Sequence, residues 1–452
     1  MPLAKNSYID TTITSMTSQG SGVARHEGMA VFVPGSAVGD RLRVKILKVL
    51  STKAYGKIEE IIAPSEDRTE PDCAVFGKCG GCDFRHITYE AELRLKWERV
   101  AQTLKRIGGV DVQPEPIIGA EQTDRYRNKT QYPVDFHDKK INIGFFAPRS
   151  HRIINCADCL LQPQSFTDIL AVFREYIEQS GVMVYDQTTH AGLLRNIYLR
   201  KAFATGEIMV CPVINGKTLP DFERLLEQLK SVDGFKTLVC NINTGRTNVI
   251  LGEQCKTLYG RGYITDELCG LRFNISPLSF YQVNSAQAQK LYTLAGEMAE
   301  PQGKTVLDLY CGTGTISLTM AQKAKQIIGV EIIPQAVQDA KQNALINGVT
   351  NARFICDDAK GAAAQLAGQG IKADAVIIDP PRKGCDVELI ETVATRLSPE
   401  RVVYVSCDPA TLARDMKAFG LLGYKTVRVV PVDMFARTAH VECVCLLSGK
   451  KR

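Results

Sequence analysis

The sequence predicts an α/β protein of several domains, with a doubly wound C-terminal domain behind a small N-terminal β-barrel and a β-rich middle section. The chain has 452 residues, of which 45% are apolar, and this is too long for one ordinary core. From Leu271 onward, apolar strands, glycine-rich turns and helical stretches alternate regularly. Such alternation predicts a mostly parallel sheet with helices on both faces.

The N-terminal residues 8–62 have the pattern of a small β-barrel. Short runs that alternate apolar and polar residues are separated by turns such as SQGSGVA and PGSAVGD. Barrels of this size often bind oligonucleotides, although a purely structural brace is the alternative. Binding is favoured by four lysines on these strands: Lys45, Lys48, Lys53 and Lys57.

The middle of the chain begins with a helix and continues with strands. In EAELRLKWERVAQTLKRIGG, apolar residues recur at helical spacing before a Gly-Gly stop, at Leu93, Trp97, Val100 and Leu104. Residues 116–270 then hold the strand candidates KTQYPVDF, KINIGFF, RNIYLRKAF, EIMVCPVI and NVILG.

In the C-terminal domain, the residues just past each strand are expected to form a ligand site, because ligands bind at the carboxyl ends of parallel strands. The glycine-rich turn Asp308–Gly314 follows the first strand. Glu331 follows the second and is suited to ribose hydroxyls, and Asp357 or Asp358 follows the third and is suited to an adenine amino group. Ser317 stands where a dinucleotide dehydrogenase normally has its third glycine, which disfavours NAD.

A reactive cysteine is expected at the same sheet edge. Asp379 follows the fourth strand, and Cys407 follows the fifth in the turn Ser-Cys-Asp-Pro. A cysteine at an exposed strand end, with a helix starting close behind, has the setting that lowers a thiol pKa.

Composition narrows the class of protein. Charged residues make up 23% of the chain, and the start MPLAKNSYIDTTIT lacks the apolar core of a secretory signal. No apolar run approaches the roughly 20 residues that a membrane span needs, so we expect a cytoplasmic protein without a membrane partner. The net charge of +6 suits a polyanion but does not decide the partner.

Cysteines are grouped in a way that predicts a metal centre. The chain has 15 cysteines, which a reducing compartment keeps free of disulfides. Cys73, Cys79, Cys82 and the distant Cys159 provide four thiolates, enough for a [4Fe-4S] cluster or a zinc site. The spacing does not choose the metal, but it differs from the Cys-x3-Cys-x2-Cys pattern of radical SAM enzymes.

Five motifs together carry a resemblance to a known family. They are FYQVN from Phe280, DLYCGTGTISL, DPPRKG, SCDPATLARD from Ser406, and the C-terminal HVECV. On these motifs the sequence resembles the RNA (uracil-C5)-methyltransferases, and within them the 23S ribosomal RNA enzymes with a TRAM domain and an iron-sulfur cluster. The likeness implies a TRAM domain, OB-like, over 1–62, a central domain with the cluster and RNA contacts over 63–92 and 116–270, and a Rossmann-like SAM methyltransferase domain over 93–115 and 271–452.

The resemblance also assigns roles to residues. It implies that Cys407 is the nucleophile, that Glu442 is the base, and that SAM (S-adenosyl-L-methionine) is contacted by Gln282, Tyr310, Glu331 and Asp379. Asp379 or Gln282 could equally hydrogen-bond the uracil edge, and Asp358 stays the candidate for the adenine. For the cluster, the resemblance implies [4Fe-4S] with Cys159 as fourth ligand and Cys156 as the runner-up.

The expected chemistry explains why a thiol and a base are needed. Carbon 5 of uracil is too weak a nucleophile to attack SAM directly, so a thiolate first adds to carbon 6. After methylation, carbon 5 must lose its proton to a base before the sulfur can leave. The related cytosine enzymes carry a cysteine beside the proline of the fourth-strand motif. Here Arg382 ends that motif and Cys385 lies beyond it, which favours uracil.

RNA is the expected partner, with a loop uridine flipped into the site. Two substrates and one non-enzymatic function stay open: 23S ribosomal RNA, transfer RNA, and a non-catalytic RNA-binding or assembly factor. The barrel and the cysteine cluster favour ribosomal RNA, because similar transfer-RNA enzymes generally lack both. A monomer is expected. Candidate RNA contacts are Arg125, Arg127, Asn128, Lys129, Arg195 and Arg200, with Tyr126 or Phe146 for stacking.

Overall fold

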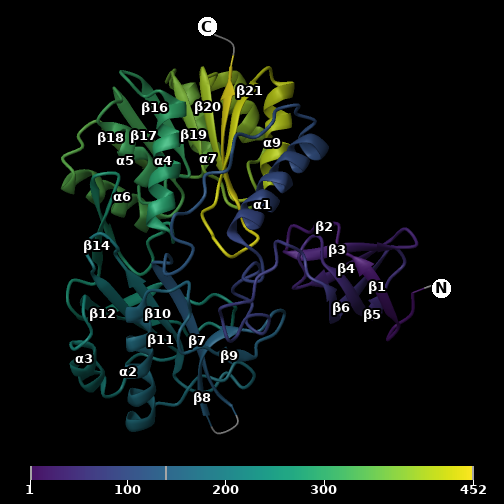
Figure 1. Cartoon of the computed structure of the whole chain (residues 1–452). Coiled ribbons are helices and arrows are strands. Elements are labelled where there is room, and N and C mark those ends of the chain that lie inside the picture. The colour runs from purple at the N-terminus through teal and green to yellow at the C-terminus, as the bar shows by residue number, and fades with distance from the viewer. Residues whose placement is uncertain (1–2, 138–139, 450–452) are drawn as a thin grey trace.

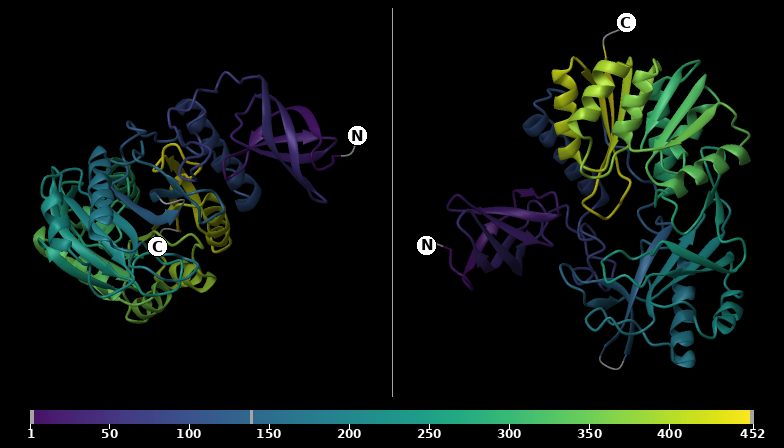
Figure 2. Two further views of the ribbon diagram at one scale, coloured as in Figure 1. Left: turned by 90° about the horizontal axis from the view of Figure 1, so that it is seen from below. Right: turned by 180° about the vertical axis from the view of Figure 1, so that it is seen from behind.

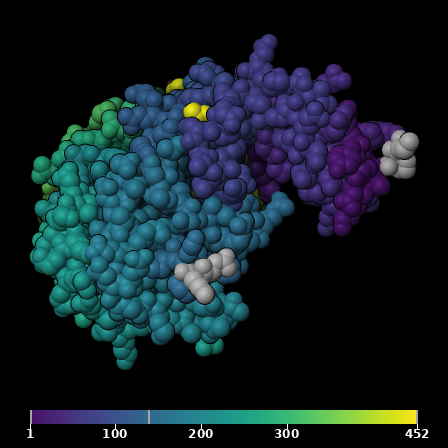
Figure 3. All heavy atoms as spheres, turned by 60° about the horizontal axis from the view of Figure 1, so that its bottom comes forward, coloured from purple at the N-terminus to yellow at the C-terminus, as the bar shows by residue number. Residues whose placement is uncertain are grey.

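The computed structural model describes residues 3–137 and 140–449. Figure 1 shows three parts: a small N-terminal sheet at one side, a central β-rich domain and a C-terminal α/β domain. Figures 2 and 3 show the N-terminal part projecting from the other two. No helix among the described residues has the length and apolar character to cross a bilayer.

The N-terminal part is a six-stranded sheet curled around its own core. Its strand order is β1-β5-β6-β4-β3-β2, and the buried residues, among them Val31, Leu42 and Val44, alternate with exposed ones. This matches the barrel expected over residues 8–62. The strands are β1 (Tyr8–Thr12), β2 (Ser15–Met16), β3 (Ser21–His26), β4 (Met29–Pro34), β5 (Arg41–Val49) and β6 (Lys53–Ala63).

The helix expected after the cysteines is α1 (Tyr89–Thr103), which continues as a π-helical turn, η1 (Leu104–Gly108). Thr88 caps its start by accepting a hydrogen bond from Ala91 N, and Gly109 ends it in the left-handed conformation (φ 60°). α1 and η1 pack on α9 (Pro409–Leu421) of the C-terminal domain, so this early segment is part of that domain's helical layer.

The central domain has a seven-stranded mixed sheet with the order β13-β12-β11-β10-β7-β8-β9, covered by two helices. Its elements are β7 (Lys129–His137), β8 (Lys140–Phe146), β9 (Ile153–Asn155), α2 (Gln164–Ser180), β10 (Leu194–Lys201), β11 (Ile208–Ile214), α3 (Phe222–Leu229), β12 (Phe235–Ile242) and β13 (Gln254–Tyr259).

The strand expected at NVILG does not form. Two asparagine side chains take the carbonyl groups that a strand would use: Asn243 Nδ2 donates to Val249 O at 2.7 Å and to Ile250 O at 2.9 Å, and Asn241 Nδ2 donates to Gly252 O at 2.8 Å. The segment is therefore an irregular turn, and the strand starts at Gln254.

A hairpin of β14 (Ile264–Leu268) and β15 (Leu271–Ile275) joins the central and C-terminal domains. The predicted boundary at residue 271 falls inside it. Its buried side chains share one core with Tyr198 and Met209 of the central sheet and with α4 of the C-terminal domain. The two domains are thus packed through a continuous apolar core.

The C-terminal sheet has the order β18-β17-β16-β19-β20-β22-β21, with β22 antiparallel to both neighbours. Its strands are β16 (Thr305–Leu309), β17 (Gln326–Glu331), β18 (Ala352–Cys356), β19 (Ala375–Ile378), β20 (Arg401–Ser406), β21 (Lys425–Val432) and β22 (Glu442–Ser448). The helices are α4 (Ser285–Ala299), α5 (Thr315–Ala321), α6 (Pro334–Ile346), α7 (Ala359–Gly368), α8 (Val387–Glu391), the π-helical η2 (Thr392–Leu397) and α9 (Pro409–Leu421).

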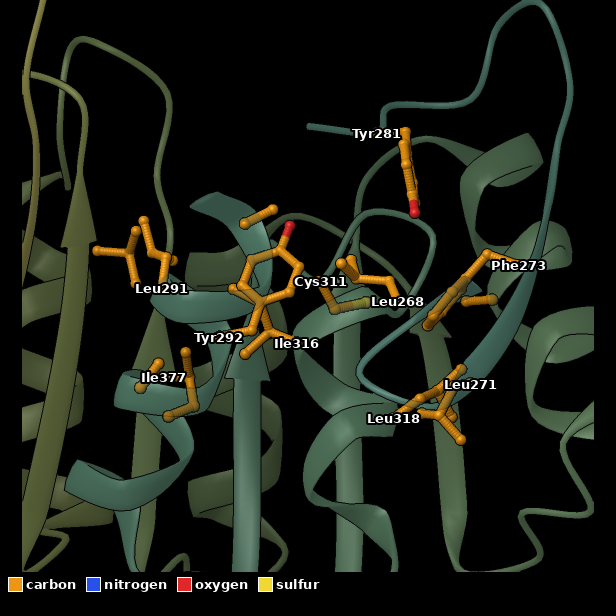
Figure 4. Close-up of a cluster of buried hydrophobic side chains, with 14 of the residues drawn as sticks. Leu268, Leu271, Phe273, Tyr281, Leu291, Tyr292, Cys311, Ile316, Leu318 and Ile377 are labelled. Carbon is orange, nitrogen blue, oxygen red and sulfur yellow. The ribbon is translucent and has the colours of Figure 1, made fainter. Parts of the chain in front are cut away.

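Helices cover both faces of this sheet, as predicted. Successive strand residues point to opposite faces, so Val306 packs with α4–α6 and Leu307 packs with α7–α9. Figure 4 shows part of the first core, where Tyr292 of α4 lies beside Ile316 of α5. The double layer buries the strands and leaves their carboxyl ends as the open edge.

Candidate active site

Strand register brings the predicted nucleophile and the predicted base to one place. Ser406, the last residue of β20, pairs with Cys443 of β22. One residue further along each strand, Cys407 follows Ser406 and Glu442 precedes Cys443, so the two positions are neighbours at the end of this ladder. Because β22 runs antiparallel to β20, its first residue lies at the edge where β20 ends. The register of β19, in which Ile378 pairs with Tyr404, sets Asp379 at the same edge.

The turn after β20 is fixed by its own hydrogen bonds. Asp408 caps α9, with its side chain accepting from Ala410 N at 2.8 Å, and Pro409 occupies the first turn of the helix. Ser406 Oγ donates to Asp408 O at 3.0 Å. The thiol of Cys407 is half-buried between these residues.

Burial and neighbouring charges at this edge favour the protonated forms of Glu442, Asp379 and Cys407. Burial, and then the charge of Asp379, raises the pKa of Glu442 to about 8. Burial, and then Asp308, raises the pKa of Asp379 to about 7. Burial, and then the charge of Glu442, raises the pKa of Cys407 to about 11, while Arg382 lowers it. At neutral pH, Cys407 and Glu442 are therefore mostly protonated.

The expectation of a lowered thiol pKa is thus wrong for the ligand-free site. The helix start and Arg382 favour the thiolate, but desolvation and two neighbouring carboxyl groups outweigh them. The sequence indicated only an effect that lowers the pKa of Cys407, because the start of the helix is adjacent in the chain. The carboxyl groups come from other strands and are brought close only by folding.

The glycine-rich turn after β16 is held against the end of β17. Gly312 N donates to Glu331 Oε2 at 3.0 Å, and Ile333 N donates to Glu331 Oε1 at 2.9 Å. Gly314 begins α5 at φ 81°, where an added Cβ would lie 3.2 Å from Phe354. Glu331 therefore lies where predicted, half-buried beside the turn. Tyr310 opens the turn with a positive φ of 69°.

Asp308, expected to open the glycine-rich turn, is a buried residue of β16. Its Oδ2 accepts from Ser317 Oγ at 2.5 Å, and its Oδ1 has no hydrogen-bond partner among the residues that the structure describes. Burial raises the pKa of Asp308 to about 7. Ser317, the residue that departs from the dinucleotide pattern, thus serves as the donor to this carboxyl group.

Asp358 has a local structural role. It caps α7, with its Oδ1 accepting from Gly361 N at 2.9 Å, and it is exposed. Its neighbour Asp357 is half-buried and accepts from Asp358 N at 2.8 Å. These hydrogen bonds engage one oxygen of each aspartate. A role of Asp358 toward a cofactor stays a prediction.

The FYQVN motif lies against the glycine-rich turn. Thr313 Oγ1 donates to Phe280 O at 3.3 Å, and Gln282 is 9% exposed. The carbonyl of Gln282 accepts from Asn128 Nδ2 at 2.8 Å. The motif therefore belongs to the same edge of the sheet as the turn and joins it to the central domain.

Several of the candidate RNA contacts have internal partners instead. Asn128 is 2% exposed and bonded to Gln282, and Arg200 is 2% exposed and donates to the carbonyl groups of Ser276 and Ser279. Tyr126 is buried with its hydroxyl donating to Ala436 O. These three residues join domains, and basic or aromatic character in the sequence could not separate that role from RNA binding.

The grouped cysteines surround one cavity of about 240 Å³. Besides Cys73, Cys79, Cys82, Cys156 and Cys159, its lining includes Arg85, Arg127 and Lys129, and burial lowers the pKa of Lys129 to about 7. Burial raises the pKa of Cys82 to about 12, while the hydrogen bond from Cys156 lowers the pKa of Cys159 to about 7. Within residues 3–137 and 140–449, no three His, Cys, Asp or Glu side chains are grouped to hold a metal ion.

The cavity nevertheless fits a metal cluster better than a single ion. In a [4Fe-4S] cluster each thiolate binds a different iron, so the ligands line a space and do not converge on one point. Five thiols around one cavity meet this requirement. Buried Arg85 pairs with Asp72 and Asp124 and lines the same space, so positive charge is available beside an anionic group.

A network of buried charges ties α1 to the segment before Glu442. Lys96 Nζ lies 2.7 Å from Glu92 Oε1 and 2.7 Å from Asp433 Oδ1, and all three side chains are at most 1% exposed. Tyr89 OH donates to Asp433 Oδ2 at 2.6 Å. The loop that leads from β21 to Glu442 is therefore anchored in the protein interior.

Comparison with known proteins identifies the family. The model of the tRNA (uracil-5-)-methyltransferase family matches residues 88–450, and the TRAM domain model matches residues 2–58. An RNA methyltransferase of Clostridium tetani, described as uncharacterized, is 44% identical over 450 residues, covering 99% of this chain and 98% of the relative. A second, from Halalkalibacterium halodurans, is 43% identical over 452 residues, covering 99% and 98%.

A solved structure extends the likeness to the whole fold. The tRNA (uracil-54, C5)-methyltransferase of Pyrococcus abyssi, in complex with S-adenosyl-L-homocysteine, aligns with a TM-score of 0.78 and 26% identity, covering 97% of this chain and 100% of its own. The predicted family, fold class and enzyme class, a SAM-dependent RNA (uracil-C5)-methyltransferase, are confirmed. The chain belongs to the tRNA (uracil-5-)-methyltransferase family and carries an N-terminal TRAM domain.

Proposed function

We propose that this enzyme methylates carbon 5 of a uracil in RNA through a covalent bond between Cys407 Sγ and carbon 6. The observation that carries the proposal is the register of β20 and β22, whose last pair is Ser406 with Cys443, so that Cys407 and Glu442 are the next residues on the two strands, and the charge of Glu442 acts on the Cys407 thiol. A non-catalytic RNA-binding or assembly factor would have no use for a thiol and a base at facing strand ends. The buried carboxyl of Glu442 would only cost such a protein stability.

The reaction proceeds in two covalent steps. The thiolate of Cys407 adds to carbon 6, and the electrons of the carbon 5–carbon 6 double bond move to form an enolate at carbon 4. Carbon 5 then displaces the methyl group of SAM, which leaves S-adenosyl-L-homocysteine. Glu442 takes the proton from carbon 5, the double bond re-forms, and the bond between Sγ and carbon 6 breaks.

Arg382 is the cation that makes both charged forms accessible. It lowers the pKa of Cys407 and opposes the rise in the pKa of Glu442. Thiolate attack and proton removal both need a deprotonated group, so a nearby guanidinium favours each of them. The pKa of Glu442 near 8 also suits a base that works close to neutral pH.

For SAM we propose the turn and strand ends beside Cys407. SAM supplies an electrophilic methyl group when bound. Glu331 is placed to meet its ribose hydroxyl groups, and the glycine-rich turn from Tyr310 lets the backbone approach closely. Gln282 and Asp379 are the further candidates for contact with SAM, and either could also bond the uracil edge. Asp358 is the candidate for the adenine.

For the cysteine cavity we propose a structural [4Fe-4S] cluster held by Cys73, Cys79, Cys82 and Cys159. The four thiols line one cavity with Arg85 and Arg127, whose charge offsets that of the thiolates. Cys159→Ala should lose most of the iron and the visible absorbance of the anaerobically purified protein. Cys156→Ala, the matched change three residues earlier in the chain, should keep the iron and the absorbance. The opposite result would make Cys156 the ligand.

For the substrate we propose 23S ribosomal RNA, with transfer RNA as the second candidate. The resemblance to TRAM-containing ribosomal RNA enzymes supports the first. The Pyrococcus abyssi structure supports the second, because that tRNA enzyme aligns over 97% of this chain, which includes the region of the barrel. The barrel therefore does not separate the two substrates, contrary to the sequence argument.

The test is transfer of labelled methyl from SAM to unmodified 23S RNA and to unmodified transfer RNA. Anaerobically purified protein is used, and the product nucleoside is identified by mass spectrometry. Label as 5-methyluridine only in 23S RNA supports the first candidate, and label only in transfer RNA supports the second. Label as 5-methylcytidine would overturn the choice of base, and no label in either RNA would revive the binding-protein alternative.

A further inference from the structure

The loop that leads to the proposed base lies outside the strand ladders. Residues 433–441 connect β21 to Glu442, the first residue of β22, and none of them lies in a helix or strand. Figures 1 and 2 show this yellow loop reaching out of the sheet toward the segment that precedes α1. In Figure 3 a few yellow atoms from the end of the chain lie among those of that segment. Its conformation must therefore come from contacts outside the sheet.

The segment directly after Cys82 contacts the loop close to Glu442. The backbone N–H groups of Asp83 and Phe84 donate to Arg437 O at 2.9 and 3.1 Å. The carboxylate of Asp83 accepts from Ala439 N at 2.8 Å through its Oδ2. Asp83 thus binds the loop on both sides of Thr438, ending three residues before Glu442.

The loop is also joined to the cysteine cavity by packing. Ala436 is fully buried in a small apolar cluster with Tyr126 and Leu161, and Cys82 and Cys159 pack against that cluster. Helix α1 holds the same loop from the other side, with Lys96 Nζ donating to Phe435 O at 3.2 Å and Arg99 Nη1 donating to Ala439 O at 2.8 Å. One loop therefore contacts both the cysteine segment and the helix that follows it.

We propose that Asp83 is a positioning residue for the base Glu442, so that the cysteine-bearing segment sets the geometry of proton removal. The inference rests on the proposed role of Glu442. Asp83 is hydrogen-bonded to this loop at Arg437 and Ala439, so it acts on Glu442 by fixing Ala439. A loop freed at Ala439 lets Glu442 shift, and small shifts of a reacting group cost roughly ten- to a hundredfold in rate.

The test uses the order of the chemical steps. Glu442 acts after the Cys407 adduct and the methyl group are in place, so a misplaced base should let methylated RNA–protein adduct accumulate. Asp83→Ala should lower turnover roughly ten- to a hundredfold and raise the fraction of adduct that survives denaturing gel electrophoresis. It should also speed hydrogen exchange in the peptide that covers residues 433–441.

Three variants make the result specific. Asp83→Asn keeps an oxygen that can accept from Ala439 N and should restore most of the turnover. Asp67→Ala removes an aspartate of the same segment that pairs with Arg94 on α1 and does not touch the loop, so it should behave as wild type. Glu442→Gln is the reference for adduct accumulation.

The outcomes separate the two proposals. Adduct accumulation in Glu442→Gln together with wild-type turnover in Asp83→Ala would overturn the positioning role alone. Equal loss of adduct formation and turnover in Asp83→Ala would also overturn it, because the variant would then act on the whole fold. No adduct in Glu442→Gln would count against the proposed base itself, and the exchange rates would still report whether Asp83 holds the loop.

Discussion

The active-site edge and the cysteine cavity are built in different ways. At the edge, Asp379, Cys407 and Glu442 are placed by the pairing of three neighbouring strands. At the cavity, the cysteines come from irregular segments, and no ladder sets their distances. The first site is rigid because its frame is a buried sheet. The second has no such frame, and its thiols are positioned by the turns that carry them and by local hydrogen bonds, such as the one between Cys156 and Cys159.

The largest expected effect is on methyl transfer, and it tests the active-site edge of the sheet. Cys407→Ala should lower methyl transfer at least about a thousandfold, because no other group can open the covalent path. The matched control is Cys385→Ala, a thiol near the same edge that is buried and contacts Tyr404 OH at 3.7 Å. It should keep activity within a few fold. A large loss in Cys385→Ala with activity retained in Cys407→Ala would reverse the assignment.

The second prediction tests how the loop before Glu442 is anchored. Lys96→Met leaves Glu92 and Asp433 buried without their cation and should lower the free energy of unfolding by about 3–5 kcal/mol. Chemical denaturation of the two proteins measures the difference. Lys290→Met breaks an exposed pair with Glu121 and should leave the unfolding curve unchanged. Equal effects of the two changes would contradict the internal anchor.

The third prediction concerns pH. Turnover should fall by at least about tenfold for each pH unit below the Glu442 pKa of about 8, because the protonated carboxyl cannot take the carbon 5 proton and release the methylated product. Arg382 lowers the pKa of both Glu442 and Cys407, so Arg382→Ala should move the whole rise to higher pH. Lys383→Ala is the control and should leave the profile in place. A profile flat from pH 6 upward would show that neither buried group limits the rate.

The smallest expected effect separates capping from cofactor binding at Asp358. Asp358→Ala removes the cap of α7 and should cost about 0.5–2 kcal/mol of stability. If Asp358 also binds the adenine, its affinity for SAM, measured by calorimetry, should fall as well. Asp358→Asn keeps a capping oxygen and should restore the stability. An unchanged SAM affinity in both variants would leave Asp358 with the cap alone.

The comparison of the two regions also explains what the sequence could predict. The strand ends were predictable, because Glu331, Asp379 and Cys407 each follow an apolar run that must be a strand. The interior roles of Asn128, Arg200 and Tyr126 were not, because a basic or aromatic residue looks the same in sequence whether it faces RNA or another domain. The raised pKa of Cys407 was missed for a related reason, since the carboxyl groups that cause it lie on other strands.

Loops were predictable only in part. The cysteine spacing indicated a shared site, but the contact between Asp83 and the loop of residues 433–441 joins segments more than 340 positions apart and leaves no local pattern. Likewise, Asn241 and Asn243 prevent a strand at NVILG through side-chain hydrogen bonds that strand propensity does not reflect.

The most direct test of the account is capture of the covalent intermediate on RNA that carries 5-fluorouridine. Fluorine at carbon 5 cannot leave as a proton, so Glu442 cannot complete the reaction and the adduct accumulates. The account predicts a complex that requires SAM and survives denaturation, with the RNA attached to the peptide containing Cys407. No complex, or a complex attached to another cysteine such as Cys385, would contradict the central claim that Cys407 is the nucleophile.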